Sequence, residues 1–179
     1  SGDGATVSTW GEVDGLDIPA DFGDTPIALY GPGTDSGTFD FFTDVVNGEE
    51  GNIRIDYTSI GEDDNAAVTA ISGDIGAMGF VPFAFYQESL DLVKGLEIDG
   101  GDGCIAPTPE AVLDGSYSPL GRELYVYASD AALSKPETVE FFNFYINNAA
   151  DIASVAGAVG LSPEQTEAQL AKVAALSGS

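Results

Sequence analysis

The chain has 179 residues, of which 44% are hydrophobic, and this is enough apolar material for a folded protein with a buried core. Thirty Asp and Glu residues against five Lys and Arg give a formal net charge of −25, which excludes nucleic acid and anionic membrane surfaces as partners because both are bound through clustered basic side chains. Histidine is absent and Cys104 is the single cysteine, so internal disulfides, most zinc sites and His-dependent nucleophilic catalysis are excluded as well.

The acidity also bears on the environment of the protein. A surface with this charge repels itself in dilute buffer, and salt screens that repulsion. A halophilic or marine source is therefore favoured, with an ordinary acidic secreted protein as the alternative. No stretch approaches the roughly 18 uncharged apolar residues of a membrane span, so we expect a soluble chain without direct membrane insertion.

The first third of the chain predicts an irregular start followed by regular elements. Residues 1–26 are rich in Gly, Asp and Pro, which indicates irregular structure with one short helical turn near Trp10. An apolar run predicts a short buried strand at 26–31. Apolar residues at helical spacing then predict a helix at 36–46, and an alternating pattern predicts a strand at 52–60.

The alternation of strands and helices continues along the chain. Further strands are predicted at 75–83, near 96–99 and at 122–130, and further helices at 61–74, 85–95, 107–115, 135–160 (with a break near Gly157) and 162–176. This order indicates an α/β fold with a mostly parallel sheet flanked by helices, plus C-terminal helices.

Glycines and hydroxyl side chains stand directly before the helix predicted at 36–46. The first N–H groups of a helix lack intrahelical partners and carry the positive end of the helix dipole. Ser36 and Thr38 add hydroxyl donors, and Gly37 leaves the backbone open to close approach. The pattern predicts an oxyanion pocket, although a simple helix cap at Ser36 or Asp35 without a ligand explains it as well.

Other chemistries fit this loop less well. No Lys follows the glycines as a nucleotide-binding loop requires, and Ser36 lacks the spacing of a nucleophile elbow. The acidic run 62–65 lacks the alternating pattern of a calcium loop, so helix capping is its favoured role. We therefore expect no metal and no cofactor.

Several segments between about Thr9 and Gly160 point to a known family, among them PIALYGPGTDSGTFDFFT, RIDYTSIGEDDNAAV, GDIGAMGFVPFAFY and PETVEFFNFYINNA. In this order they resemble the high-affinity phosphate-binding proteins of phosphate ABC transporters, in particular the branch common in cyanobacteria and related marine bacteria. The resemblance implies a periplasmic-binding-protein fold of the second type, in which two α/β lobes close on a bare oxyanion. It also implies that Ser36, Gly37 and Thr38 supply ligand donors.

The chain departs from this family in its cationic contact. Some relatives carry an arginine shortly before the Ser-Gly-Thr triplet, where this chain has Pro32 and Gly33. Arg54 is the candidate that replaces it, and the alternative is a structural Arg54 paired with Asp56 or another carboxylate.

The chain also resembles only the later part of the family, because the N-terminal lobe has no counterpart before Thr9. Half of the binding site is then expected outside this sequence. The expected organisation is an irregular segment at 1–26, an anion-binding lobe at 27–120, and a crossover strand with C-terminal helices of the other lobe at 121–179.

The sequence thus predicts a periplasmic or extracellular solute-binding protein, or a fragment of one, with or without an anchor at the cell surface. It would capture inorganic phosphate or another tetrahedral oxyanion for the membrane permease of an ABC importer, without catalysis. One alternative is a secreted scaffold or adhesion module of the same fold that has lost binding. Another is a phosphoryl hydrolase or transferase that uses Ser36 or the pair Asp63 and Asp64.

Overall fold

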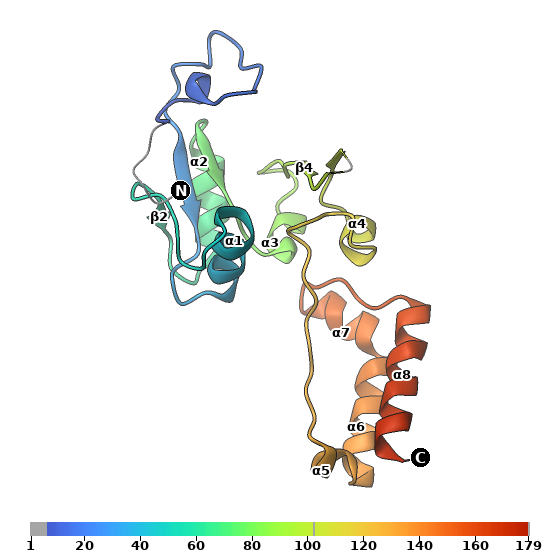
Figure 1. Cartoon of the computed structure of the whole chain (residues 1–179). Helices are drawn as coiled ribbons and strands as arrows, with labels where there is room; N and C mark the ends of the chain where they lie inside the picture. Colours follow the sequence, from blue (N-terminus) through green and yellow to red (C-terminus); the bar gives the residue numbers. More distant parts are fainter. Residues whose placement is uncertain (1–6, 102, 179) are drawn as a thin grey trace. The chain divides into compact units, whose positions relative to one another are not determined.

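The computed structural model describes residues 7–101 and 103–178, and the chain forms two compact units, Ser1–Gly95 and Leu96–Ser179 (Figure 1). The division between the units thus falls at Gly95. The expected lobe assignment, with boundaries after residues 26 and 120, concerns a two-lobed whole protein and stays a prediction.

The first unit contains a parallel three-stranded sheet with the strand order β2-β1-β3. The central strand β1 (Ala28–Gly31) pairs on one side with β2 (Thr58–Ser59) and on the other with β3 (Ala77–Gly79). In register, Tyr30 faces Thr58 across one pair and Gly79 across the other. Parallel strands joined by helices confirm the predicted α/β class.

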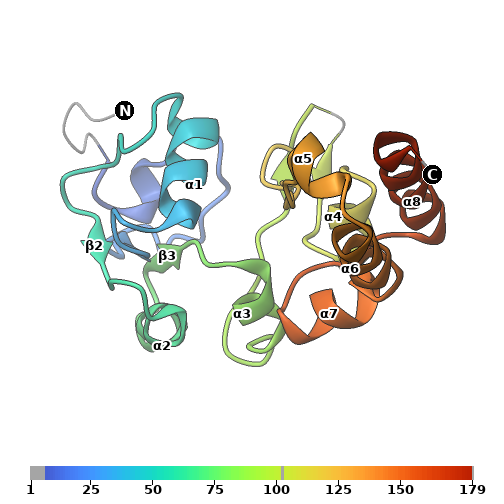
Figure 2. The same ribbon diagram turned by 90° about the horizontal axis from the view of Figure 1, so that it is seen from below.

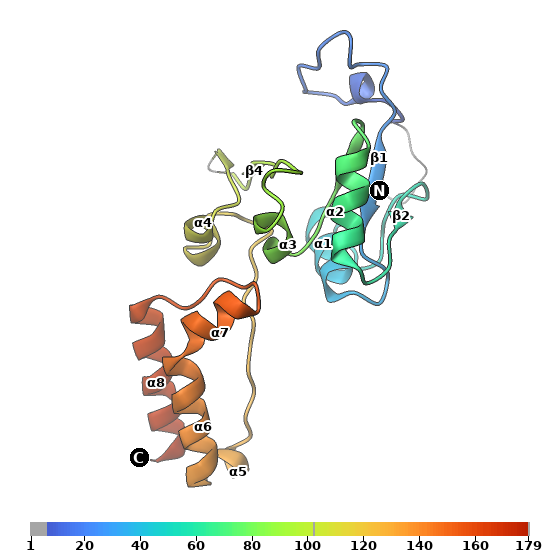
Figure 3. The same cartoon turned by 180° about the vertical axis from the view of Figure 1, so that it is seen from behind.

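Helices cover both faces of this sheet, with α1 on one face and α2 on the other (Figures 2 and 3). The core of the unit comprises Phe39 and Thr43 from α1 with Ala67 and Val68 from α2, all nearly inaccessible to solvent. The helices of the unit are the 3₁₀-helix η1 (Trp10–Glu12), α1 (Gly37–Asn47), α2 (Asp64–Gly73) and α3 (Phe83–Gln87).

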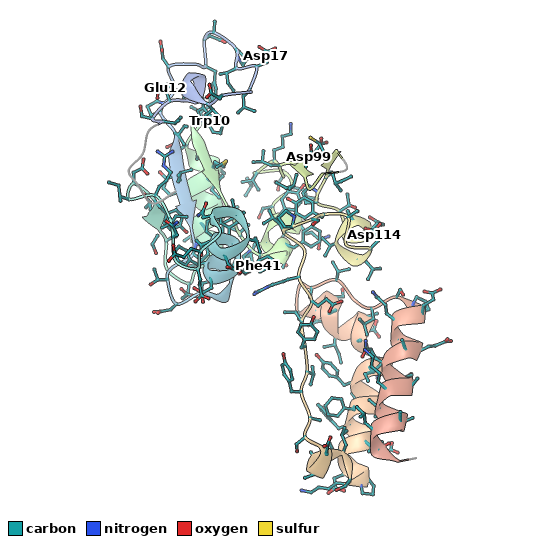
Figure 4. All side chains as sticks on the ribbon, in the orientation of Figure 1. Trp10, Glu12, Asp17, Phe41, Asp99 and Asp114 are labelled. Carbon is teal, nitrogen blue, oxygen red and sulfur yellow. The ribbon has the colours of Figure 1, made fainter. Side chains whose placement is uncertain are left out.

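The short helix η1 confirms the helical turn predicted near Trp10. Glu12 closes a capping box with Thr9, and its carboxylate accepts hydrogen bonds from the backbone N–H of Ser8 at 2.7 Å and of Thr9 at 3.1 Å. These bonds lower the pKa of Glu12. The indole of Trp10 donates to the carbonyl of Gly76 at 3.0 Å and so fastens the N-terminal segment to the sheet; Trp10 and Glu12 are labelled in Figure 4.

The strand predicted at 52–60 is largely wrong, because only Thr58–Ser59 forms strand. The residues before it form a turn, in which the N–H of Tyr57 donates to the carbonyl of Arg54 at 3.1 Å. Ile55, which the alternating pattern places on the same face as Ile53 and Tyr57, has 82% of its surface exposed. An ion pair between Arg54 and Asp56 holds the turn, and Arg54 also donates to the carbonyl of Val7, a tertiary contact that overrides the alternating pattern.

The helix predicted at 85–95 is also shifted. Helix α3 begins at Phe83, directly after Pro82, and ends at Gln87. The N–H of Ser89 donates to the carbonyl of Tyr86 in the turn that follows, and Leu90 is exposed. Proline favours a helix start because it brings no N–H that would need a partner there.

The second unit combines a β-hairpin with helices. Strands β4 (Ile98–Asp99) and β5 (Cys104–Ile105) pair antiparallel. Helices α6 and α8 pack side by side, as Figure 2 shows, and the buried apolar residues of these helices and of α5 are Leu133, Ile146 and Val173. The helices of the unit are α4 (Pro109–Leu113), α5 (Asp130–Leu133), α6 (Pro136–Asn147), α7 (Ala149–Val155) and α8 (Pro163–Ser177).

The strand predicted at 122–130 is wrong. Residues 122–129 belong to an exposed extended segment between α4 and α5, visible in Figures 1 and 3, and Asp130 begins α5. The long helix predicted at 135–160 ends near Gly157 as predicted, because α7 ends at Val155, but it has a further, unpredicted break at Asn148. At the break, the amide side chains of Asn147 and Asn148 donate to the helix carbonyls of Asn143 and Phe144, and such local bonds compete with helix continuation.

Candidate anion-binding site

The candidate site lies where the central strand β1 leads into helix α1. Gly31, Pro32 and Gly33 are buried, the next two residues are exposed, and Ser36 is half-buried. Because all three strands are parallel, the loops after β1 and β2 leave the sheet at the same edge. The carboxyl edge of a parallel sheet is where α/β folds bind ligands.

Ser36 is the N-cap of α1. Its backbone is extended, at φ −91° and ψ 126°, and its Oγ accepts a hydrogen bond from the N–H of Thr38 at 3.2 Å. The cap itself is therefore confirmed, at Ser36, and ligand binding by Ser36 stays a prediction. A serine hydroxyl that accepts one bond still has its own proton to donate, so the cap leaves Ser36 able to bind an anion.

Gly37 and Thr38 follow Ser36 in the first turn of α1, where the helix dipole favours negative charge. Gly37 is exposed and Thr38 is half-buried, so both lie within reach of a ligand at the surface of the unit. The N–H of Thr38, predicted to contact the ligand, is engaged with Ser36 Oγ in this structure. An anion has to share or replace that bond.

The loop before α1 is held by hydrogen bonds from both sides. The N–H of Ser36 donates to the carbonyl of Gly33 at 3.1 Å, and the N–H of Gly33 donates to the carbonyl of Gly61 at 2.9 Å. On the strand side, the N–H of Ile60 donates to the carbonyl of Gly31 at 2.9 Å. The loop after β1 is thus continuous with the loop after β2.

Acidic side chains surround this loop. A methyl group added at Gly33 would lie 3.0 Å from Glu62 Oε1, so this carboxylate stands beside the loop. Asp63 caps α2 by accepting from the N–H groups of Asn65 and Ala66, which confirms its predicted capping role. Burial, and then the charges of Glu62 and Asp63, raise the pKa of Asp64. An anion here therefore depends on N–H and hydroxyl donors rather than on the surrounding charge.

Arg54 is bound to Asp56 through two contacts, Nε to Oδ1 at 2.9 Å and Nη2 to Oδ2 at 2.7 Å. Its Nη2 also donates to the carbonyl of Val7 at 2.8 Å. The hydrogen bonds from Arg54 lower the pKa of Asp56. The structural alternative for Arg54 is thus observed, and a contact between Arg54 and a ligand stays a prediction.

Sequence reasoning missed Tyr57, whose hydroxyl donates to the carbonyl of Pro32 at 2.8 Å. Its ring lies 5.9 Å from those of Phe39 and Phe80, and Phe80 stacks on Phe42 with centroids 3.9 Å apart. Burial raises the pKa of Tyr57, so its hydroxyl stays protonated and able to donate. The alternating pattern placed Tyr57 on one face with Ile53 and Ile55 but contained no information about Pro32.

Residues 7–101 and 103–178 contain neither a candidate metal site nor a candidate membrane-spanning helix. No group of three or more His, Cys, Asp and Glu side chains there is arranged to hold a metal ion. No helix within these ranges has the length and apolar character to cross a bilayer.

Comparison with known proteins places the chain in a family. Residues 4–149 match the PBP superfamily domain, and this match covers most of the chain. The chain belongs to the PBP superfamily. A PBP-superfamily fold, with a parallel sheet flanked by helices, agrees with the architecture described above and confirms the predicted fold class.

Three relatives of this PBP-superfamily chain are 29% to 37% identical to it over the aligned residues. It is 37% identical to protein SphX of Synechococcus elongatus, over 80% of this chain and 42% of the relative. It is 36% identical to SphX of Synechocystis, over 89% and 46%, and 29% identical to the phosphate-binding protein PstS of Staphylococcus epidermidis, over 84% and 45%. The chain thus spans less than half the length of these curated relatives.

A solved structure resembles the backbone. The crystal structure of a possible phosphate binding protein from Planctomyces limnophilus aligns with a TM-score of 0.78 and 29% identity, over 98% of this chain and 61% of that chain. Nearly the whole PBP-superfamily chain therefore matches one part of a longer protein.

Proposed function

We propose that this chain is part of a solute-binding protein that captures inorganic phosphate for an ABC importer. The observation that carries the proposal is the Ser-Gly-Thr triplet at the N-terminus of α1, at the carboxyl edge of a parallel sheet. The names of the PstS relatives and of the solved neighbour support phosphate as the ligand. Since the chain spans less than half of its relatives, the ligand and the permease belong to the whole protein.

In this proposal the anion lies over the first turn of α1. The hydroxyls of Ser36 and Thr38 and the N–H of Gly37 donate to phosphate oxygens, and the helix dipole adds a favourable field. Arg54 has five N–H donors, of which Asp56 and Val7 engage Nε and Nη2. The guanidinium therefore has the capacity for a further acceptor and is our candidate for the cationic contact.

We also propose that residues 121–179 belong with a second lobe formed by polypeptide that the relatives have in addition. Each residue from 121 to 130 is exposed, including Leu124, Tyr125, Val126 and Tyr127. Helix α6 exposes Phe141 and Phe144. An apolar surface of this extent is typical of a face that another structure covers.

The proposed protein performs no chemistry and works in the periplasm or outside the cell, with or without an anchor. The relatives named for an activity are binding proteins, which supports this against a phosphoryl hydrolase or transferase. A phosphatase assay with Mg²⁺ or Ca²⁺ tests the enzymatic alternative, since turnover lost in Ser36→Ala would contradict a pure binding role.

A thermal melt in high KCl tests the proposed ligand. A ligand that binds the folded state raises stability by mass action, so millimolar phosphate and arsenate are expected to raise Tm and sulfate is not. The double variant Ser36→Ala/Thr38→Ala should lose this ligand-dependent shift.

The control variant is Ser162→Ala, because Ser162 caps α8 in the same way, accepting from the N–H of Gln165 at 3.2 Å. Both variants lose a cap, which costs about 1 kcal/mol, and only the first should lose the response to phosphate. No shift with any anion contradicts phosphate binding by these residues alone. Equal shifts with sulfate contradict selectivity for phosphate.

A further inference from the structure

Tyr57 connects the anion-binding loop to the core of the first unit. Its hydroxyl reaches the carbonyl of Pro32, 25 positions earlier in the chain, at 2.8 Å. Its ring is held between Phe39, in the first turn of α1, and Phe80, directly after β3. The side chain of Tyr57 thus contacts the loop at Pro32, helix α1 at Phe39, and the residue after strand β3 at Phe80.

The backbone at Gly31 is adapted to this contact. A Cβ at Gly31 would collide with the hydroxyl of Tyr57 and would lie 3.3 Å from the ring of Phe80. Gly31 has no left-handed backbone conformation, so its lack of a side chain serves close approach here and not backbone freedom. The space that glycine leaves is filled by the Tyr57 hydroxyl.

The carbonyl of Pro32 needs a hydrogen-bond donor, and the hydroxyl of Tyr57 supplies it. Pro32 is buried, and a buried carbonyl without a partner is costly. The segment that contains it continues through Gly33, whose carbonyl accepts from the N–H of Ser36 at 3.1 Å. The position of the Pro32 carbonyl therefore affects the position of Ser36, the residue that caps α1, because Gly33 connects the two.

We propose that Tyr57 is a positioning residue of the anion site: its hydroxyl, through the Pro32 carbonyl, holds the loop so that Ser36 and Thr38 present their donors to one ligand. The inference rests on the proposed function. It adds a residue that does not touch the ligand and that lies outside the Ser-Gly-Thr motif.

The substitution Tyr57→Phe tests the hydroxyl alone, because the phenyl ring still packs between Phe39 and Phe80. We expect the affinity for inorganic phosphate, measured by calorimetric titration, to fall about tenfold, as for the loss of one buried hydrogen bond. The matched control is Tyr117→Phe, which removes a hydroxyl that donates to the carbonyl of Leu96 at 3.1 Å in the second unit. The control should bind phosphate like the parent chain.

A second pair of variants tests the position of the Tyr57 hydroxyl by changing Gly31 instead of Tyr57. Gly31→Ala should displace the Tyr57 hydroxyl and weaken phosphate binding like Tyr57→Phe. Gly73→Ala is its control, since a Cβ at Gly73 meets nothing within 4 Å. If Gly31→Ala fails to fold, Tyr57→Phe still decides the question because it adds no atoms.

Amide hydrogen exchange provides a readout that needs no ligand. In Tyr57→Phe the N–H groups of Gly33 and Ser36, which hold the loop, should exchange several-fold faster, while the α2 amides keep their rates. Unchanged exchange at both positions overturns the positioning role. Phosphate binding by the parent chain and by Tyr57→Phe with equal affinity overturns it too. Failure of the parent chain to bind phosphate contradicts phosphate binding by this part of the protein alone, and exchange then decides on Tyr57.

Discussion

At the scale of single residues, the pair of Arg54 and Asp56 shows how a side-chain contact can stabilise a turn where the sequence pattern predicts a strand. The alternation from Asn52 to Ile60 is typical of a strand, yet the guanidinium binds both carboxylate oxygens two residues on, and the carbonyl of Val7 as well. The chain turns there. Arg54 therefore stabilises the turn in the observed structure, and a contact between Arg54 and a ligand stays a separate proposal.

The variant Asp56→Asn tests the strength of this pair. The folded-state pKa of Asp56 is lowered, so its contribution to stability is present above the ordinary value of 3.8 and is lost as pH falls through the folded pKa. We expect the variant to be less stable than the parent at pH 7 by about 0.5 kcal/mol, because the pair is partly exposed. Urea unfolding at pH 7 and at a series of pH values below 3.8 measures the difference, which should shrink as pH falls. A difference that stays constant over this series would show that the ion pair is not its cause.

At the scale of elements, the segment between α4 and α5 has the composition of a strand without a partner strand in the described residues. Leu124, Val126 and Tyr127 point to β structure by propensity, but Tyr127 is 86% exposed and the segment is absent from both sheets. Figure 4 shows its side chains projecting from the extended chain along its length. An exposed apolar segment of this kind tends to pair with another chain.

We therefore expect the isolated chain to self-associate through this segment as its concentration rises. The double variant Leu124→Lys/Val126→Lys should reduce association, because charged side chains on an exposed edge oppose pairing. Val155→Lys is the control, since Val155 is 92% exposed but lies in helix α7. Sedimentation velocity over a range of concentrations measures the effect. Equal association of both variants and the parent would place the contact elsewhere.

At the scale of the whole molecule, the main feature is the negative net charge. Thirty acidic and five basic residues give −25, and the residues that bear on the anion site include Glu62 and Asp63 rather than a basic cluster. Repulsion among these charges destabilises the compact state and opposes an incoming anion over long distances. Salt weakens both effects, and we propose a halophilic or marine setting for this reason.

Raising KCl from 0.1 M to 1 M shortens the Debye length from about 10 Å to about 3 Å. Tm should therefore rise over this range, and phosphate affinity should stay level or improve, unlike that of a site built from clustered Lys and Arg. Melting in sucrose at equal osmolality controls for solute exclusion. A falling phosphate affinity with rising KCl would indicate that a cationic contact such as Arg54 carries the binding.

The sequence by itself determined the elements whose bonds are local. Helix α1 and its cap at Ser36 follow from hydrogen bonds between residues two to four positions apart, as does the cap of α2 at Asp63. The short strand β1 was also predicted, because its apolar run ends at a glycine and a proline. The Ser-Gly-Thr triplet could be singled out for the same reason: its chemistry lies within three consecutive residues.

Only the tertiary structure decided the features that join distant positions. Arg54 meets Val7 and Tyr57 meets Pro32, and no periodicity in the sequence encodes either pair. The segment 122–130 differs for a related reason, since a strand forms only when a second strand supplies its hydrogen-bond partners. A helix carries its partners within its own residues, whereas a strand or a positioned loop depends on which other part of the chain folds against it.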